Sequence, residues 1–386
     1  MEIFNQISAD DFFQNYWQKK PLLIKNAIPN FESPLDADEL AGLACEEEVE
    51  SRLILEIGGQ KPWEVTSGPI SEEVLTSLPE TNWSLAIQGV DRLIPEVSKL
   101  LSHFKFLPNW LLDDIMTSYA PDKGSVGAHI DNYDVFIIQA QGRRRWFLGG
   151  EPEYNEKYQE GLDIRLLEKF EPVYEWDVES GDVLYIPTRF AHHGVAIGEC
   201  LNYSVGFRAP TDIELVNSLA SWSLDKEVPE KFFSDPNIEQ QESPGEITDK
   251  SLNALAQHIK DFIDSPNFKL WFGEHISEPK TYLQQQEEDT QLTDEQLLAE
   301  LRNGEVLLPA EGLKRCWIRS TESLLFIEGE RVNVSKPLNP EICALLCDAE
   351  EIGIANVSDD VEVAKVLLEL LTTLYNRGHV LFQEKD

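Results

Sequence analysis

Two histidines and one aspartate are spaced so that they could hold a metal ion. His129 and Asp131 are separated by one residue in "AHIDNYDVFIIQA", and in an extended strand positions i and i+2 face the same side of the sheet. A further histidine, His192 or His193, follows the apolar run "DVLYIP". Two histidines and one carboxylate are the ligand set of a facial triad, which leaves positions on Fe(II) open for a bidentate cosubstrate and oxygen.

The third ligand would be one of two neighbouring histidines in the segment "IPTRFAHHG". Adjacent residues of an extended chain point to opposite sides, so only one of His192 and His193 can join the ion held by His129 and Asp131. A His-x-Asp pair alone is also typical of a surface turn. The metal interpretation therefore depends on the context, which is a strand-like segment around the pair, a buried strand before the later histidines, and a well-placed basic residue.

Three consecutive arginines follow the apolar run, in "QGRRRW". If this segment is a strand directly after a Gly turn, Arg144 shares one face with Trp146, whereas Arg143 and Arg145 lie on the other. An arginine facing the interior of a barrel is costly unless a carboxylate pairs with it. A dicarboxylate cosubstrate could supply that carboxylate at one end and chelate the metal as a 2-oxo acid at the other. The alternative is that all three arginines are solvated or paired at the surface.

Four further polar residues of the same region could help to bind a cosubstrate. They are Ser118 and Tyr119 in "DDIMTSYAP", and Asn202 and Ser204 in "CLNYSVGFR". Asn202 and Ser204 share one face of their strand. Each of the four could hydrogen-bond the cosubstrate, and each could equally satisfy a backbone group of the barrel.

The elements that would position these residues are short strands between about residues 107 and 210. Gly and Pro punctuate this region at intervals typical of a β-barrel, and "ESGDVLYIP" indicates a turn followed by a buried strand. We therefore predict a small barrel of the jelly-roll type. Before it, residues 1–100 are predicted to be mixed α and β, with a first helix capped by Ser8 and a short strand, "LLIKN", after Pro21.

The chain changes character after residue 211. Helices are predicted for "DIELVNSLASWSLDKE", "SLNALAQHIKDFID" and "SPNFKLWFGEHIS". The last two carry aromatic side chains that we expect to be exposed, at Phe262, Phe268, Trp271 and Phe272. Such helices can pack on a second subunit, although packing within the chain explains the aromatic residues as easily. A Gln/Glu-rich linker is predicted at "EPKTYLQQQEEDTQ".

A last domain is predicted from about residue 292 to residue 386. Its pattern is a helix, several strands, two helices and a final strand, which suggests a winged-helix-like module. Residues 280–386 contain 10 basic and 21 acidic residues, a balance of −11. A winged helix that reads DNA needs a basic recognition face. Direct DNA binding is therefore not expected, and a protein-interaction or structural role is.

The whole chain is strongly acidic, with 32 basic and 70 acidic residues and a net charge of −38. This charge repels nucleic acid and anionic membranes and favours basic partners, although it could also serve solubility alone. No apolar run approaches the length of a membrane span, and the acidic, aromatic N-terminus is unlike a signal peptide. We expect a cytoplasmic protein whose five cysteines are small buried hydrophobic residues.

Three segments together resemble one family. "GAHIDNYDVFIIQAQGRRRW", "SGDVLYIPTRFAHHG" and "LNYSVGFRAP" are similar to the JmjC-type ribosomal oxygenases of bacteria, the ribosomal-protein arginine hydroxylases. The similarity extends over nearly the whole chain, through "NYWQKKPLLIKNA", "TNWSLAIQGV" and "WFGE". The chain departs from the family in one turn, because Thr188 and Arg189 stand where members often carry Pro-Gly.

The resemblance implies an α+β chain with a double-stranded β-helix core of the JmjC and cupin type. It implies a catalytic domain at 1–211, a helical dimerisation region at 212–279 and an acidic winged-helix-like domain at 280–386. It also implies Fe(II) held by His129, Asp131 and His192, and 2-oxoglutarate whose distal carboxylate meets Arg144 and Ser118.

The reaction that the resemblance implies consumes O2 and converts 2-oxoglutarate to succinate and CO2, coupled to hydroxylation of an arginine side chain at its β-carbon. The implied substrate is large-subunit ribosomal protein sixteen, a basic protein that an acidic enzyme would attract. A carboxylate near the iron could meet the substrate guanidinium, and Asp122 in "APDKG" is a candidate, the alternative being a solvated turn residue.

Other functions remain open at the level of sequence. A protein of the same fold could hydroxylate histidine or demethylate lysine, because substrate choice depends on loops and pocket shape. A catalytically silent barrel could act as a ribosome-assembly binding module, although such a module has no need of a metal triad or an inward arginine. A cupin-type isomerase or dioxygenase acting on a small molecule is a further alternative.

Overall fold

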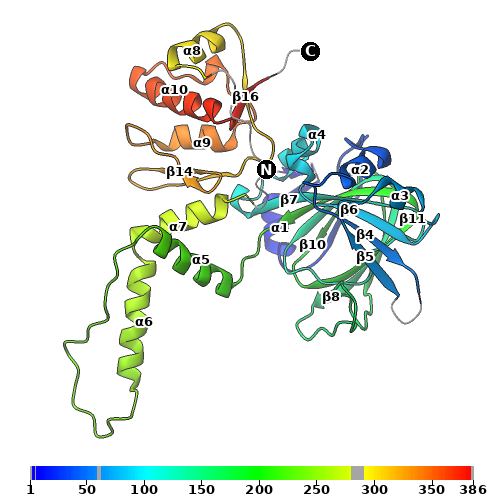
Figure 1. The fold of residues 1–386 in the computed structure, drawn as a ribbon, viewed down its shortest axis with the longest axis horizontal. Helices are drawn as coiled ribbons and strands as arrows, with labels where there is room; N and C mark the ends of the chain where they lie inside the picture. Colours follow the sequence, from blue (N-terminus) through cyan, green and yellow to red (C-terminus); the bar gives the residue numbers. More distant parts are fainter. Residues whose placement is uncertain (1, 5, 59–61, 280–290, 384–386) are drawn as a thin grey trace. The chain divides into compact units, whose positions relative to one another are not determined.

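The computed structural model of the protein describes residues 1–386 except for 1, 5, 59–61, 280–290 and 384–386 (Figure 1). The described chain forms two compact units, Met1–Ala209 and Pro210–Asp386. Most of the predicted Gln/Glu-rich linker lies outside the described residues. In the described part of the chain, no helix has both the length and the apolar character needed to cross a membrane.

The described residues of the first unit form eleven strands and several short helices, with Ser8 capping the first helix as predicted. The strands are β1 Glu2–Ile3, β2 Ile7–Ser8, β3 Leu22–Ile24, β4 Ser51–Glu56, β5 Trp63–Ser67, β6 Trp83–Ile87, β7 Leu112–Ala120, β8 Val135–Pro152, β9 Tyr174–Glu179, β10 Val183–Ile186 and β11 Phe190–Phe207. The helices are α1 Ala9–Asn15, α2 Ala37–Ala44, α3 Glu72–Thr76 and α4 Pro95–Ser98, with 3-10 turns η1 Val90–Arg92, η2 Lys99–Phe104 and η3 Asn109–Leu111.

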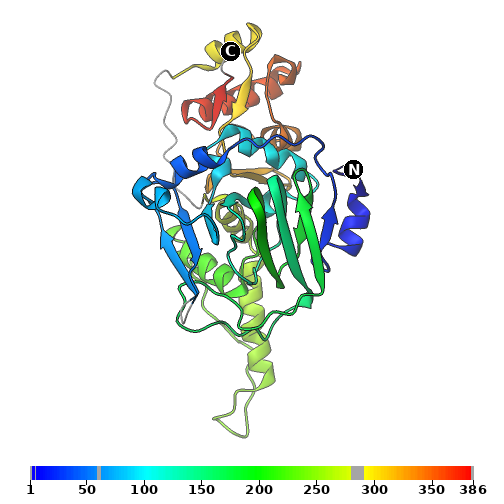
Figure 2. The same cartoon turned by 90° about the vertical axis from the view of Figure 1, so that its right-hand side faces the viewer.

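Nine of these strands form one antiparallel sheet in the order β3-β10-β8-β11-β7-β6-β4-β5, with β9 added alongside β8. Strands β8 and β11 are long, and each takes different partners along its length. The first half of β8 pairs with β10 and the second half with β9, while β11 pairs with both halves of β8. The sheet rolls up, as Figure 2 shows for the green strands. The predicted double-stranded β-helix core is confirmed.

The interior of the roll is defined by side chains that come from both halves of β8. Val135 and Ile137 from the first half pack with Trp146 and Leu148 from the second half. The alternate residues of the first half, such as Phe136, face the other way and form a second core, which the N-terminal helices cover. The interior is therefore closed between two layers, and its polar residues are shielded from water.

The predicted Gly turn before the arginines is wrong, because β8 runs through it as one strand. Gly142 instead forms a bulge: Arg143 pairs with Ile197 and Gln141 with Leu201, so that three residues of β11 lie opposite one residue of β8. Gly142 has φ +66°, a conformation that favours glycine. A bulge of this kind bends a strand without ending its pairing. The predicted break between the histidines and "CLNYSVGFR" is absent for the same reason, since β11 is also continuous.

We expect Gly142→Ala to destabilise the first unit by more than about 2 kcal/mol, because the added Cβ would collide with the carbonyl oxygen of Glu199 in addition to the strain at positive φ. Gly198→Ala is the matched control. Gly198 lies across the same bulge at φ +71°, yet its Cβ would meet nothing within 4 Å. The control should cost only about 1 kcal/mol. Urea unfolding measures the free energy of unfolding of both variants. An equal loss in the two would show that the contact of the Cβ with the Glu199 carbonyl oxygen does not contribute.

The second unit begins with three helices, α5 Asp212–Asp225, α6 Asp249–Ile263 and α7 Pro266–Ser277. It continues with α8 Asp294–Arg302, β12 Leu307–Pro309, β13 Arg315–Ile318, β14 Leu324–Ile327, β15 Glu330–Arg331, α9 Pro340–Asp348, η4 Ile354–Asn356, α10 Val361–Asn376 and β16 Val380–Phe382. This element order matches the predicted order, and the winged-helix domain is confirmed. The division of this part into 212–279 and 280–386 stays a prediction.

One expectation about the helical region is wrong. Trp271 is buried, with 2% of its surface exposed, and its indole N–H donates to Ser218 of α5 at 3.1 Å. Helix α7 also packs on strands β13, β14 and β15 of the same unit. Gly273 of α7 lies so close to Phe326 of β14 that a Cβ would clash with the ring. Trp271 therefore packs within the chain, whereas Phe268 and Phe272 are half-buried.

Candidate metal and cosubstrate site

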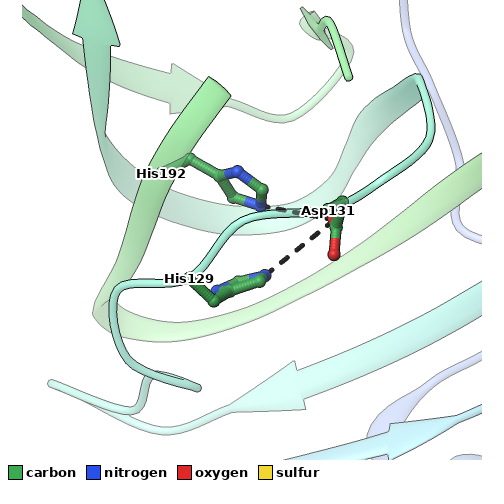
Figure 3. Close-up of side chains that lie close together, drawn as sticks. All are labelled: His129, Asp131 and His192. Carbon is green, nitrogen blue, oxygen red and sulfur yellow. Dashed lines mark ion pairs between the residues drawn. The ribbon is translucent and has the colours of Figure 1, made fainter. Parts of the chain in front are cut away.

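His129 and His192 lie directly opposite each other in a two-residue β-bridge. The backbone of each donates to the other, with N···O distances of 3.0 and 2.9 Å. Residues paired in this way direct their side chains to the same face, and the ring centroids are 4.2 Å apart. The Asp131 carboxylate lies beside the two rings and faces both, as Figure 3 shows. Its Oδ2 is 3.5 Å from Nε2 of His192 and 4.0 Å from Nε2 of His129.

Both imidazoles are oriented by backbone carbonyls. Nδ1 of His129 is 2.9 Å from the oxygen of Gly127, and Nδ1 of His192 is 2.9 Å from the oxygen of Phe190. A carbonyl only accepts, so each Nδ1–H donates and each Nε2 keeps its lone pair toward Asp131. Burial lowers the pKa of His192 to about 4, which keeps that ring neutral. No sequence pattern could have indicated these two carbonyls, because every residue type supplies one.

The three candidate ligand atoms lie within 4.8 Å of one another, and they are the one such group of His, Cys, Asp and Glu found in the described residues. Two neutral imidazoles and a carboxylate converging at this separation suit a divalent transition metal with open coordination positions. The two rings come from opposite sides of the bridge, and the ring of His193, the other candidate, lies 6.1 Å from that of Phe147 instead. The structure therefore brings together His129, Asp131 and His192.

The prediction that His129 and Asp131 lie in a strand is wrong in detail, because β8 begins only at Val135. The partner strand β10 ends at Ile186, which pairs with Val135, and Pro187 follows. A proline has no N–H to extend the ladder. The preceding segment is held by the bridge between His129 and His192 and by a hydrogen bond of 2.8 Å from the Arg189 N–H to the Asp131 carbonyl oxygen.

Arg144 points into the roll and is buried, with 3% of its surface exposed. Its Nη1 is 3.5 Å from the hydroxyl of Ser118, and that hydroxyl donates to Oδ1 of Asn202. Its Nε and Nη2 are buried and have no hydrogen-bond partner among the described residues. A buried guanidinium whose N–H donors lack partners destabilises the fold. Its parallel N–H donors match the two oxygen atoms of a carboxylate. This arrangement fits the far end of a dicarboxylate cosubstrate.

The neighbouring arginines lie on the outer face of the sheet. Arg145 binds Asp177 through two hydrogen bonds of 2.6 and 3.0 Å, and Arg143 lies 3.9 Å from the same carboxylate. Arg144 is therefore the member of the run that faces inward.

Three other residues that were candidates for binding the cosubstrate or the substrate lie elsewhere or have no contact that demonstrates such a role. Tyr119 packs against Trp83 in the outer core. Ser204 is half-buried. Asp122 accepts a hydrogen bond of 2.9 Å from the N–H of Gly198, so it stabilises the bulge.

The sequence matches two protein families, the JmjC domain at residues 99–215 and the ROXA-like winged helix at residues 254–380. The rolled sheet and its His-Asp-His group thus define a JmjC-type oxygenase. The chain is 36% identical over 386 residues to the ribosomal protein uL16 3-hydroxylase of Escherichia coli, covering 99% of this chain and 100% of that protein. The chain belongs to the family of bacterial JmjC-type ribosomal oxygenases.

Further relatives agree with this placement. A probable ribosomal oxygenase of Haemophilus influenzae is 34% identical over 261 residues, 66% of this chain and 64% of that protein. A solved structure of an Escherichia coli ribosomal oxygenase in complex with cobalt and 2-oxoglutarate superposes with a TM-score of 0.84 at 34% identity, covering 98% of this chain and 99% of the other.

Proposed function

We propose that this protein is an Fe(II)- and 2-oxoglutarate-dependent hydroxylase that acts on an arginine side chain of ribosomal protein uL16. The observation that carries the proposal is the full-length identity of 36% to the uL16 3-hydroxylase of Escherichia coli. The His-Asp-His group and the inward Arg144 supply the donor types that this chemistry needs. A catalytically silent binding module would need neither.

In this proposal, Nε2 of His129, Nε2 of His192 and the carboxylate of Asp131 hold Fe(II). Arg144 and Ser118 hold the distal carboxylate of 2-oxoglutarate. The bound iron and cosubstrate supply oxidative decarboxylation of 2-oxoglutarate by O2, giving succinate and CO2 and transferring one oxygen atom to the β-carbon of the arginine. The carbonyls of Gly127 and Phe190 fix the imidazole tautomers, and the apolar interior of the roll limits the access of water.

The net negative charge of the chain supports the proposal that its substrate is a basic macromolecule. The net charge of −38 attracts basic proteins over a distance, in a manner that salt weakens. Ribosomal proteins are basic, and uL16 is the substrate named for the full-length relative. We place the reaction in the cytoplasm, where such a substrate is made.

The test is to incubate the purified protein with unmodified uL16, Fe(II) and 2-oxoglutarate, and to measure succinate and the masses of uL16 peptides. We expect succinate to rise with uL16 and one arginine peptide to gain the mass of one oxygen atom. Oxygen added to a histidine, or methyl groups lost from lysine, would favour the related histidyl hydroxylase or lysine demethylase activity. No change on any arginine would reject the proposal.

We also propose that the chain forms a homodimer through its helical region. On α6 the apolar side chains of Leu252, Leu255, Ile259 and Phe262 are exposed, and their spacing places them along one face of the helix. Large apolar faces of this kind mark subunit contacts. Light scattering should give twice the chain mass for the wild type and the chain mass for Ile259→Glu.

A further inference from the structure

Arg189 adopts a backbone conformation that its residue type disfavours. Its φ is +67°. This value lies in the left-handed region, which glycine adopts without steric cost and in which other residues are strained. The residue lies in the turn between β10 and β11, shortly before His192. Strain at such a position persists only where surrounding contacts maintain it, and the side chain of Arg189 makes many.

The guanidinium of Arg189 joins two segments that are distant in the sequence. Nη1 donates to Oδ1 of Asn132 at 2.7 Å, next to the candidate ligand Asp131. Nε donates to the carbonyl oxygen of Glu153 at 3.0 Å, and Nη2 donates to Oε2 of Glu156 at 2.6 Å. Only 17% of each side chain of the Arg189–Glu156 pair is exposed. Arg189 thus ties the metal-ligand segment to the β8–β9 loop, residues 153–173.

The same loop contacts the other end of the metal-ligand segment. The N–H of Leu167 donates to the carbonyl oxygen of Ala128 at 2.9 Å, beside His129. The side chain of Leu166 fills the space next to Gly127, where a Cβ would clash with it. The β8–β9 loop therefore holds residues 128–132 from both sides, with Leu167 at one end and Arg189 at the other.

We propose that Arg189 is a positioning residue for the reaction, which fastens the β8–β9 loop to the segment carrying His129 and Asp131 and so keeps the Asp131 carboxylate at the metal. Asp131 has no strand ladder around it, because β8 begins at Val135. Few backbone hydrogen bonds hold this segment, among them the one from the Arg189 N–H to the Asp131 carbonyl oxygen, and side-chain contacts add rigidity that a ladder would otherwise give. The inference rests on the metal site of the proposed function.

The test compares Arg189→Gly with the wild type. Glycine relieves the positive-φ strain and keeps the backbone hydrogen bonds of this residue to Asp131 and Glu153, so the variant should fold. We expect about 10-fold weaker binding of Co(II) by calorimetry, as for the loss of other groups that orient metal ligands. Trypsin should also cut the β8–β9 loop faster, at Lys157, Arg165 or Lys169.

Arg145→Ala is the matched control, because Arg145 makes a similar two-bond pair with Asp177 on the outer face of the sheet. It should leave Co(II) affinity and loop cleavage unchanged. Arg189→Lys keeps the positive charge but loses the planar set of N–H donors of the guanidinium. Its Co(II) affinity and its rate of loop cleavage should lie between those of the wild type and those of the glycine variant. Wild-type affinity and wild-type cleavage in Arg189→Gly would overturn the inference, as would equal losses in Arg145→Ala. Failure of the wild type to bind Co(II) would instead overturn the proposed metal site.

Discussion

Asp131→Ala should reduce metal affinity by more than about 100-fold and abolish succinate formation. Loss of a group that merely orients a ligand costs about 10- to 100-fold, and Asp131 is the one carboxylate in the group of candidate ligands. Two neutral imidazoles would remain, without the negative charge that offsets the charge of Fe(II). Calorimetric titration with Co(II) and a succinate assay measure the two effects.

The fold should survive this change. The Asp131 side chain is partly exposed, with 22% of its area accessible, and the ionisable groups near it are the two imidazoles. Substitutions at such positions alter the free energy of unfolding by about 0.5 kcal/mol or less. Asp177→Ala, on the outer face of the sheet, is the control and should keep full metal affinity. Retention of tight Co(II) binding by Asp131→Ala would refute the proposed ligand set.

Arg144→Met should have opposite effects on cosubstrate binding and on stability. Removing one partner of a buried charge pair costs about 2–5 kcal/mol, so the KM for 2-oxoglutarate should rise by at least about 30-fold. Without cosubstrate the Arg144 guanidinium is buried with two unused donor nitrogens. Methionine removes this unpaired charge, and we expect the cosubstrate-free protein to gain about 1 kcal/mol or more in the free energy of unfolding.

Arg143→Met is the matched control, since the Arg143 side chain is 45% exposed and lies 3.9 Å from Asp177. It should leave both the KM and the free energy of unfolding nearly unchanged. Urea unfolding without cosubstrate measures the free energy of unfolding of each variant. Rates of succinate formation over a range of 2-oxoglutarate concentrations give the KM. A weaker fold together with an unchanged KM in Arg144→Met would show that Arg144 has a structural role and does not bind the cosubstrate.

Local patterns predicted most of the elements. Ser8 caps the first helix, "DVLYIP" contains a fully buried strand, and the helices and strands after residue 292 occur in the predicted order. These features depend on capping and on apolar periodicity, which act over a few residues. Trp271 was misplaced because its indole N–H donates to Ser218 of α5, 53 residues away in the chain, and periodicity carries no information about such distant packing.

The sequence by itself determined the donor set: a His-x-Asp pair, a later histidine and an arginine cluster, with donor types that suit Fe(II) and a dicarboxylate. Which arginine faces inward was decided by the tertiary structure. Val135, Ile137 and Gln139 alternate toward the interior, and unbroken alternation would continue to Arg143. The alternation shifts by one residue where Gln139 and Gln141 pair with two adjacent residues of β11, Asn202 and Leu201, so Arg144 and Trp146 point inward.

The tertiary structure likewise decided which histidine joins the metal group. His192 lies opposite His129 in a bridge that forms only when β11 returns alongside the segment before β8. Because side chains alternate along a strand, only one of the two neighbouring histidines can face the metal group. Which one does so is set by the register of the strand with its partner strand. Local sequence thus specified the chemistry of the ligands. Long-range pairing set the phase of each strand, because the phase depends on hydrogen bonds between residues far apart in the chain.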